Sequence, residues 1–174
     1  MGSCARVVVV CSLVALTACT TGTGDFDEGT ADITVEREGE EPLRLVHDPE
    51  LSQVTLTPPT EGTVELDFTY QDPLVTLRLV VNTEVVDEGE EVALPVTAPR
   101  TADDLLLTLE IDDALFTSDD PGAAGSVLFD VLFVDEEAGA ADVIATIEAT
   151  LVGAGATVSV SGHVEARVGE LDDL

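Results

Sequence analysis

Two side-chain types are scarce in this 174-residue chain, and each scarcity excludes a class of function. There is no tryptophan and one tyrosine, and aromatic residues make up 3% of the chain. Glycosidases pair two carboxylates at a set separation and usually add aromatic platforms for sugar rings, so sugar hydrolysis and sugar binding are poorly supported. All six basic residues are arginine, against 36 acids, which gives a net charge of −30. Binding to phosphate backbones requires a basic surface, so nucleic acid is excluded as a partner.

Cysteine occurs three times, at Cys4, Cys11 and Cys19, and nowhere in the following 155 residues. The folded part therefore has no disulfide, no thiol nucleophile and no cysteine-bound metal, although the compartment predicted below permits disulfides. Because 45% of the residues are hydrophobic, the high charge does not indicate disorder. A chain of this length forms one ordinary domain.

The N-terminus has the pattern of a secretory signal. Arg6 precedes an apolar run, Val7 to Leu16, that is interrupted only by Ser12. Ten helical residues rise about 15 Å, half of a hydrocarbon core of about 30 Å, so this run is too short to span a bilayer. A basic start, a short apolar centre and small residues at the end are typical of a secretory signal.

The end of this signal, Leu16-Thr17-Ala18-Cys19, resembles a bacterial lipobox. The resemblance covers residues 1–19 only. It implies that the thiol of Cys19 receives a diacylglyceryl group, that cleavage occurs just before it, and that fatty acids such as palmitate anchor the chain. Several acyl chains together give stable membrane anchoring. In Gram-negative lipoproteins, Asp after the cysteine favours retention at the inner membrane, so Thr20 implies the outer membrane. The alternative is an ordinary signal peptide.

These features predict three segments. Residues 1–18 are the signal peptide, 19–31 are the lipidated cysteine with a flexible Gly- and Thr-rich tether, and 32–174 are a single domain. Cleavage removes Arg6 and no acid, so the mature charge is 5 − 36 = −31. This charge disfavours contact with anionic lipid and leaves cations, basic proteins or no partner at all as the possibilities. The alternative to a functional acidic surface is a background charge, from salt adaptation or from a GC-rich genome that avoids lysine codons, and the spread of the acids over the whole chain favours this interpretation.

Alternation of apolar and polar residues predicts strands along the domain. It is strongest over 64–70, 75–81, 105–111, 127–133 and 158–168, with shorter candidates at 33–35, 43–46, 54–56 and 92–96. In 127–133, Val127, Phe129, Val131 and Phe133 share one face, and Leu128 and Leu132 make the other face apolar as well. Segment 138–152 also fits an amphipathic helix, but its β-branched residues favour a strand. Pro95 indicates an edge strand.

About 8–10 strands separated by Pro- and Gly-containing turns predict an all-β fold. The expected architecture is an antiparallel β-sandwich of immunoglobulin-like type. The Cys–Trp–Cys signature of true immunoglobulin domains is missing, so the prediction concerns architecture alone.

Few residues offer chemistry. His163 lies between Ser161 and Glu165, but alternate strand residues are about 6.6 Å apart, too far for a direct proton relay. His163 and His47 are therefore interpreted as solvated. Asp112, Asp113, Asp119 and Asp120 flank one loop and are the candidate calcium ligands, because calcium takes six to eight oxygens. The opposing interpretation is a solvated acidic loop.

The sequence thus predicts a lipid-anchored protein of the bacterial cell envelope that is not an enzyme. Its expected role is that of a structural or interaction module with an unknown protein partner and no cofactor. The alternative is a calcium-dependent adhesion or binding module.

Overall fold

The computed structural model describes residues 28–169. They form eleven antiparallel strands, which confirms the predicted all-β antiparallel class. The strands are β1 (Glu28–Arg37), β2 (Leu43–Val46), β3 (Ser52–Thr60), β4 (Thr63–Gln71), β5 (Leu74–Asn82), β6 (Glu91–Leu94), β7 (Leu105–Ile111), β8 (Ala114–Thr117), β9 (Ala124–Asp135), β10 (Ala140–Gly153) and β11 (Ala156–Val168).

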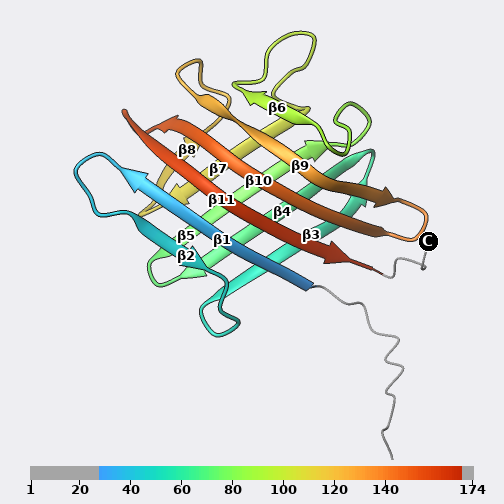
Figure 1. Ribbon diagram of the computed structural model, residues 1–174, viewed down its shortest axis with the longest axis horizontal. Helices are drawn as coiled ribbons and strands as arrows, with labels where there is room; N and C mark the ends of the chain where they lie inside the picture. Colours follow the sequence, from blue (N-terminus) through green and yellow to red (C-terminus); the bar gives the residue numbers. More distant parts are fainter. Residues whose placement is uncertain (1–27, 170–174) are drawn as a thin grey trace, which may run out of the picture.

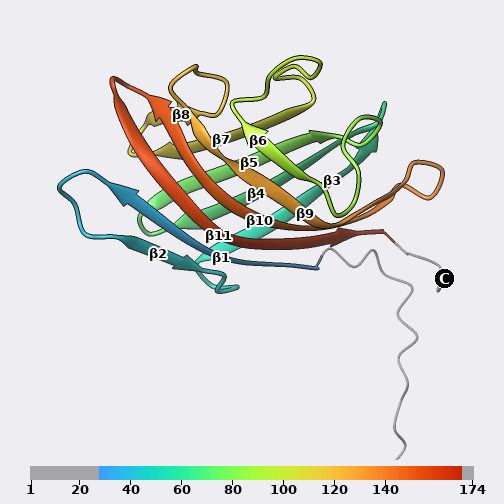
Figure 2. The same ribbon diagram turned by 45° about the horizontal axis from the view of Figure 1, so that its top comes forward.

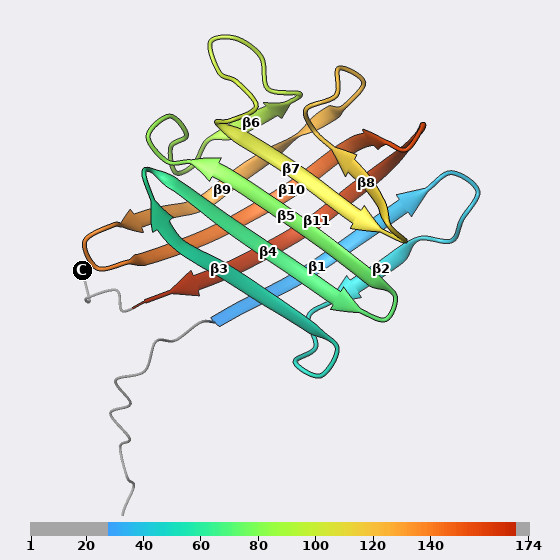
Figure 3. The ribbon, with the colours of Figure 1, turned by 180° about the vertical axis from the view of Figure 1, so that it is seen from behind.

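The strands form one strongly curled sheet. Its order is β2-β1-β11-β10-β8-β7-β5-β4-β3, and β9 pairs with both β10 and β6. Figures 1 and 3 show β1, β9, β10 and β11 on one side of the molecule and β3, β4, β5 and β7 on the other. The turned view in Figure 2 shows the sheet bending between these sides. At the bend, β8 meets β10 through one residue pair, Thr117 with Val152.

The core fills the concave side of this sheet. Along β5, Val75, Leu77, Leu79 and Val81 are buried, as their alternation predicts. The largest fully buried side chains come from both sides of the sheet; they are Phe68, Phe129, Ile33, Leu45, Leu66, Leu77, Leu79, Leu105, Leu107, Leu109, Ile111 and Ile147. Burial of these residues accounts for the folding of a chain with no disulfide in its domain.

Two polar contacts connect turns on opposite sides of the sheet. The Gly62 N–H, in the β3–β4 turn, donates to Glu136 Oε1 in the β9–β10 turn at 2.6 Å. Arg37 Nη1, at the end of β1, donates to Asp112 Oδ2 in the β7–β8 turn at 3.2 Å. Both contacts help to hold the curl closed over the core.

A β-bulge in β9 corrects one detail of the predicted pattern. Ala145 of β10 pairs with Phe129, while its neighbour Ile144 pairs with Val131, so Asp130 is the extra residue. An extra residue in one strand exchanges the faces of the sheet to which all later side chains of that strand point. Phe129 therefore points into the core, whereas Val131 and Phe133 share the outer face with Ile144.

The predicted strands are otherwise found, with differences in their bounds and one additional strand. Segment 138–152 is the strand β10. β6 ends just before Pro95, pairs with β9 alone among residues 28–169, and is an edge strand as predicted. β8 was not predicted from the sequence. β1 begins at Glu28, so residues 28–31 of the predicted tether belong to the sheet.

Candidate functional site

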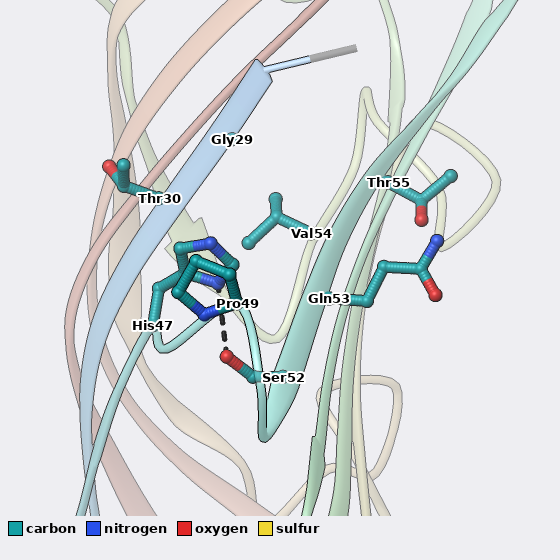
Figure 4. A pocket seen from close by; sticks show the side chains of 8 residues that line it. All are labelled: Gly29, Thr30, His47, Pro49, Ser52, Gln53, Val54 and Thr55. Carbon is teal, nitrogen blue, oxygen red and sulfur yellow. Dashed lines mark hydrogen bonds between the residues drawn. The ribbon is translucent and has the colours of Figure 1, made fainter.

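A groove of about 530 Å³ lies where the two ends of the curled sheet approach each other, between β1 and β3 (Figure 4). Its lining residues are Gly29, Thr30, His47, Pro49, Ser52, Gln53, Val54 and Thr55. A Cβ atom on Gly29 would lie 2.5 Å from Val54 Cβ and Cγ1. Glycine at this position therefore permits β1 and β3 to approach closely, and Val54 packs across the junction (Figure 4).

His47 and Ser52 hold the loop at the base of this groove. The Ser52 hydroxyl oxygen lies 3.0 Å from His47 Nδ1 and accepts the Asp48 N–H at 2.8 Å. The same hydroxyl donates to the Asp48 carbonyl at 3.0 Å. Since a hydroxyl has one proton, the assignment that satisfies all three contacts places a proton on His47 Nδ1.

This network organises the loop and leaves Ser52 poorly suited to catalysis. Ser52 is buried, and its hydroxyl proton and both lone pairs are engaged. A nucleophilic serine must instead give its proton to the base in the presence of substrate. The sequence predicts a solvated His47 and gives no direct sign of its contact with Ser52. The available signal is the Asp48-Pro49 turn, which brings position 52 back beside position 47.

His163 has a different environment, on the exposed outer face of β11. Its Nδ1 lies 3.5 Å from the hydroxyl of Thr146, its partner across β10. Thr146 Oγ1 in turn donates to Asp130 Oδ2 at 3.2 Å. Among residues 28–169, the hydrogen-bond contact of His163 is therefore across the strands, with Thr146, and not with Ser161 or Glu165 along its own strand.

The four candidate calcium ligands lie at opposite ends of β8. Asp112 and Asp113 form the two-residue turn before it, with φ values of 52° and 63°, and Asp119 and Asp120 follow its last residue. Asp112 binds Arg37, and Asp120 Oδ1 accepts the Gly122 N–H at 2.9 Å. The hairpin does not gather the four carboxylates around one ion. Within residues 28–169, no group of three or more His, Cys, Asp or Glu side chains is arranged to hold a metal.

Turn geometry gives a physical reason for the Asp112-Asp113 pair. Positive φ at both central residues is the condition of a type I′ hairpin turn, which favours Asp-Gly or Asn-Gly. We expect Asp113→Gly to stabilise the domain by about 0.5–1 kcal/mol, because glycine adopts this conformation without strain. Thermal unfolding with and without calcium measures this effect. A loss of stability that appears only with calcium would instead show that Asp113 binds the ion.

Acidic side chains neutralise the arginines in the described part of the chain. Each arginine among residues 28–169 contacts at least one acid: Arg37 with Glu40 and Asp112, Arg44 with Asp32, Arg78 with Glu65 and Asp67, Arg100 with Glu90, and Arg167 with Asp142. Hydrogen bonding from Arg44 lowers the pKa of Asp32, and hydrogen bonding from Arg100 lowers the pKa of Glu90. The excess acids leave the surface strongly negative.

Cys19, the predicted lipidation site, lies outside the described residues. Within them, no helix is long and apolar enough to cross a bilayer. Comparisons with protein-family models, curated proteins and solved structures find no match to this chain.

Proposed function

We propose that this chain is a bacterial lipoprotein, anchored in the cell envelope through Cys19, whose β-domain acts as a structural or interaction module. The observation that carries the proposal is the position of Cys19 in Leu16-Thr17-Ala18-Cys19, nine residues before the first strand at Glu28. Nine extended residues span at most about 30 Å. A lipid on Cys19 would thus keep the domain close to the membrane, which is the outer membrane if the host is Gram-negative.

An interaction role is favoured over catalysis by the chemistry of the groove and by the charge. The Ser52 hydroxyl is fully engaged, and His163 contacts a threonine. A surface with neutralised arginines and many acids instead suits a basic protein partner.

We also propose that the curled sheet is an immunoglobulin-like β-sandwich. Support comes from the two groups of strands that face each other across one apolar core, and whose ladders among residues 28–169 meet at β8 and β10 through the pair Thr117–Val152.

Replacement of Cys19 tests the anchor. The full chain is expressed in a Gram-negative bacterium fed an alkyne-labelled fatty acid, and label and membrane association are measured. Cys19→Ser should lose the lipid label and leave the membrane fraction, because no other thiol lies at the cleavage position. Cys4→Ser and Cys11→Ser are matched controls that keep both.

Label retained in Cys19→Ser, or lost equally in Cys11→Ser, would refute anchoring at Cys19. For the membrane of residence, Thr20→Asp should shift the labelled protein from the outer to the inner membrane.

A further inference from the structure

The bulge at Asp130 creates an apolar strip on the outer face of the sheet, made of Leu128, Val131, Phe133 and Ile144. Ile144 pairs directly with Val131, and Leu128 pairs with Thr146, the next outward residue of β10. All four side chains are partly exposed. The outer face of an antiparallel sheet is normally polar, so a contiguous apolar strip here indicates a surface that is covered in use.

The same part of β9 also has a free backbone edge. β6 pairs with β9 only from Gly125 to Leu128, and two further backbone bonds join Phe129 to Gly89 and Glu90. Among the described residues, Val131–Asp135 pair with β10 alone. Figure 1 shows β6 beside one part of β9 and the rest continuing beside β10. A free edge can accept another strand.

A buried carboxylate without a complete set of partners adjoins the strip. Asp142 lies on the outer face of β10, between Phe133 of β9 and Arg167 of β11. It is 7% exposed, and its Oδ2 accepts hydrogen bonds from Arg167. Its Oδ1 is buried and has no hydrogen-bond partner among residues 28–169. A buried acceptor in this state costs free energy, which a donor from a bound partner would recover.

The acidic side chains at the margins of the strip favour a basic partner. Glu91 pairs with Leu128, Glu165 pairs with Ile144, and Asp130 is exposed at the bulge. Arg167, paired with Asp142, is a basic residue on the same face, but the acids outnumber it and leave the margin net negative. An apolar strip with such a margin is complementary to a segment that carries both apolar and basic side chains.

We propose that β9 binds an extended segment of a basic protein by strand addition at Val131–Asp135. Apolar side chains of the segment would cover Val131 and Phe133, and a Lys or Arg on the same face would approach Asp142. Asp142 lies about 9.6 Å from the added strand, two strand spacings, which a lysine and an aspartate side chain span together. This inference rests on the proposed interaction role and not on the lipid anchor.

The test uses the full chain carrying Cys19→Ser, so that binding is measured independently of anchoring. The probe is the fluorescein-labelled peptide Lys-Thr-Val-Thr-Lys-Thr-Val-Thr-Lys, whose lysines and valines share one strand face. Its matched control replaces both valines by serine and keeps the charge. Fluorescence anisotropy should show binding of the valine peptide that is about tenfold tighter. Methylation of alternate backbone nitrogens in the probe should weaken its binding, because it removes strand pairing.

Variants of the chain then locate the site. Phe133→Ser should weaken binding of the valine peptide about tenfold. Leu115→Ser, at an apolar residue of β8 that is 58% exposed, should leave the affinity unchanged. Ile144→Thr, a milder change on the same strip, should weaken it less. Thermal unfolding of each variant establishes that it is folded.

Several outcomes would overturn the proposal. Equal affinity for the valine and serine peptides would mean non-specific attraction to the acidic surface. A dimer in sedimentation that Phe133→Ser dissociates would identify a second copy as the occupant. Tighter peptide binding after deletion of residues 170–174 would identify the chain's own C-terminus. None of these results would bear on lipidation at Cys19.

Discussion

Replacing Gly162 by alanine is expected to remove a large part of the free energy of unfolding of the domain. Gly162 lies in β11, between β1 and β10, and has a φ of 148°. A Cβ atom there would lie 2.1 Å from the Asp32 carbonyl oxygen and 2.8 Å from Ile33 Cα. Because both contacts are with paired backbone, relief requires breaking the β1–β11 ladder. Overpacking and backbone strain together cost about 3–5 kcal/mol, a large part of the 5–15 kcal/mol that stabilises a typical domain.

A matched glycine separates the close contact from the backbone conformation. Gly39, in the β1–β2 turn, has a φ of 80° and no atom within 4 Å of an added Cβ. Gly39→Ala should therefore cost only about 1 kcal/mol. Thermal unfolding by circular dichroism on both full-length variants compares them. If the two variants unfolded at the same temperature within the error of the measurement, this would contradict the close contact between position 162 and the backbone of β1.

The strands with strict alternation were predictable because one face of each is buried. Val75, Leu77, Leu79 and Val81 could occupy only the inward positions of β5. β8 was missed because its four residues, Ala114–Thr117, are too few to establish a period. Glu28–Ala31 were assigned to the tether because no apolar period marks them, and their place in β1 depends on pairing with β11.

The bulge in β9 could not be predicted for a related reason. Residues 127–134 are apolar at nearly every position, so the sequence is compatible with either facing after Phe129. Pairing with β10 decides between them, and it places Leu132 and Val134 against the core. The outer strip of the candidate binding surface was therefore invisible in the sequence, although each of its residues was recognised as part of a strand.

The four candidate calcium ligands lie apart because proximity in sequence is not proximity in a hairpin. Six strand residues span about 20 Å, so a short strand is enough to separate Asp113 from Asp119. The Asp112-Asp113 pair instead indicates a local backbone conformation, because both residues occupy the positive-φ positions of a turn. Tertiary contacts, such as that between Ser52 and His47, lay beyond any period-based prediction.

Neutral salt is expected to stabilise this domain strongly. The chain carries a net charge of −30, and repulsion among its acids opposes the compact state. The Debye length falls from about 30 Å at 0.01 M salt to about 3 Å at 1 M. Over this range we expect a gain on the order of 2 kcal/mol, or about 5–8 °C in the midpoint of thermal unfolding.

The pH dependence should have a maximum, because two effects of opposite sign contribute. Repulsion is stronger in the compact state, which therefore binds protons more readily than the unfolded chain, so stability rises as the pH falls from 7 towards about 5. Asp32 and Glu90 act oppositely, since hydrogen bonds from Arg44 and Arg100 lower their pKa below the ordinary values of 3.8 and 4.5. Their contribution is present above those values and is lost as the pH falls through the lowered pKa of each group.

A comparison of salts at matched ionic strength distinguishes general screening of the acidic side chains from a calcium-specific site. Screening depends on ionic strength alone, so sodium, magnesium and calcium chloride should raise the midpoint of the full chain equally. A calcium-specific site would add a further increase that grows with free calcium, because an ion that binds only the native state stabilises it by mass action. The separation of Asp112 and Asp113 from Asp119 and Asp120 along β8 leads us to expect equal increases. A calcium-specific increase that Asp119→Asn removes would show instead that the loop rearranges to bind the ion.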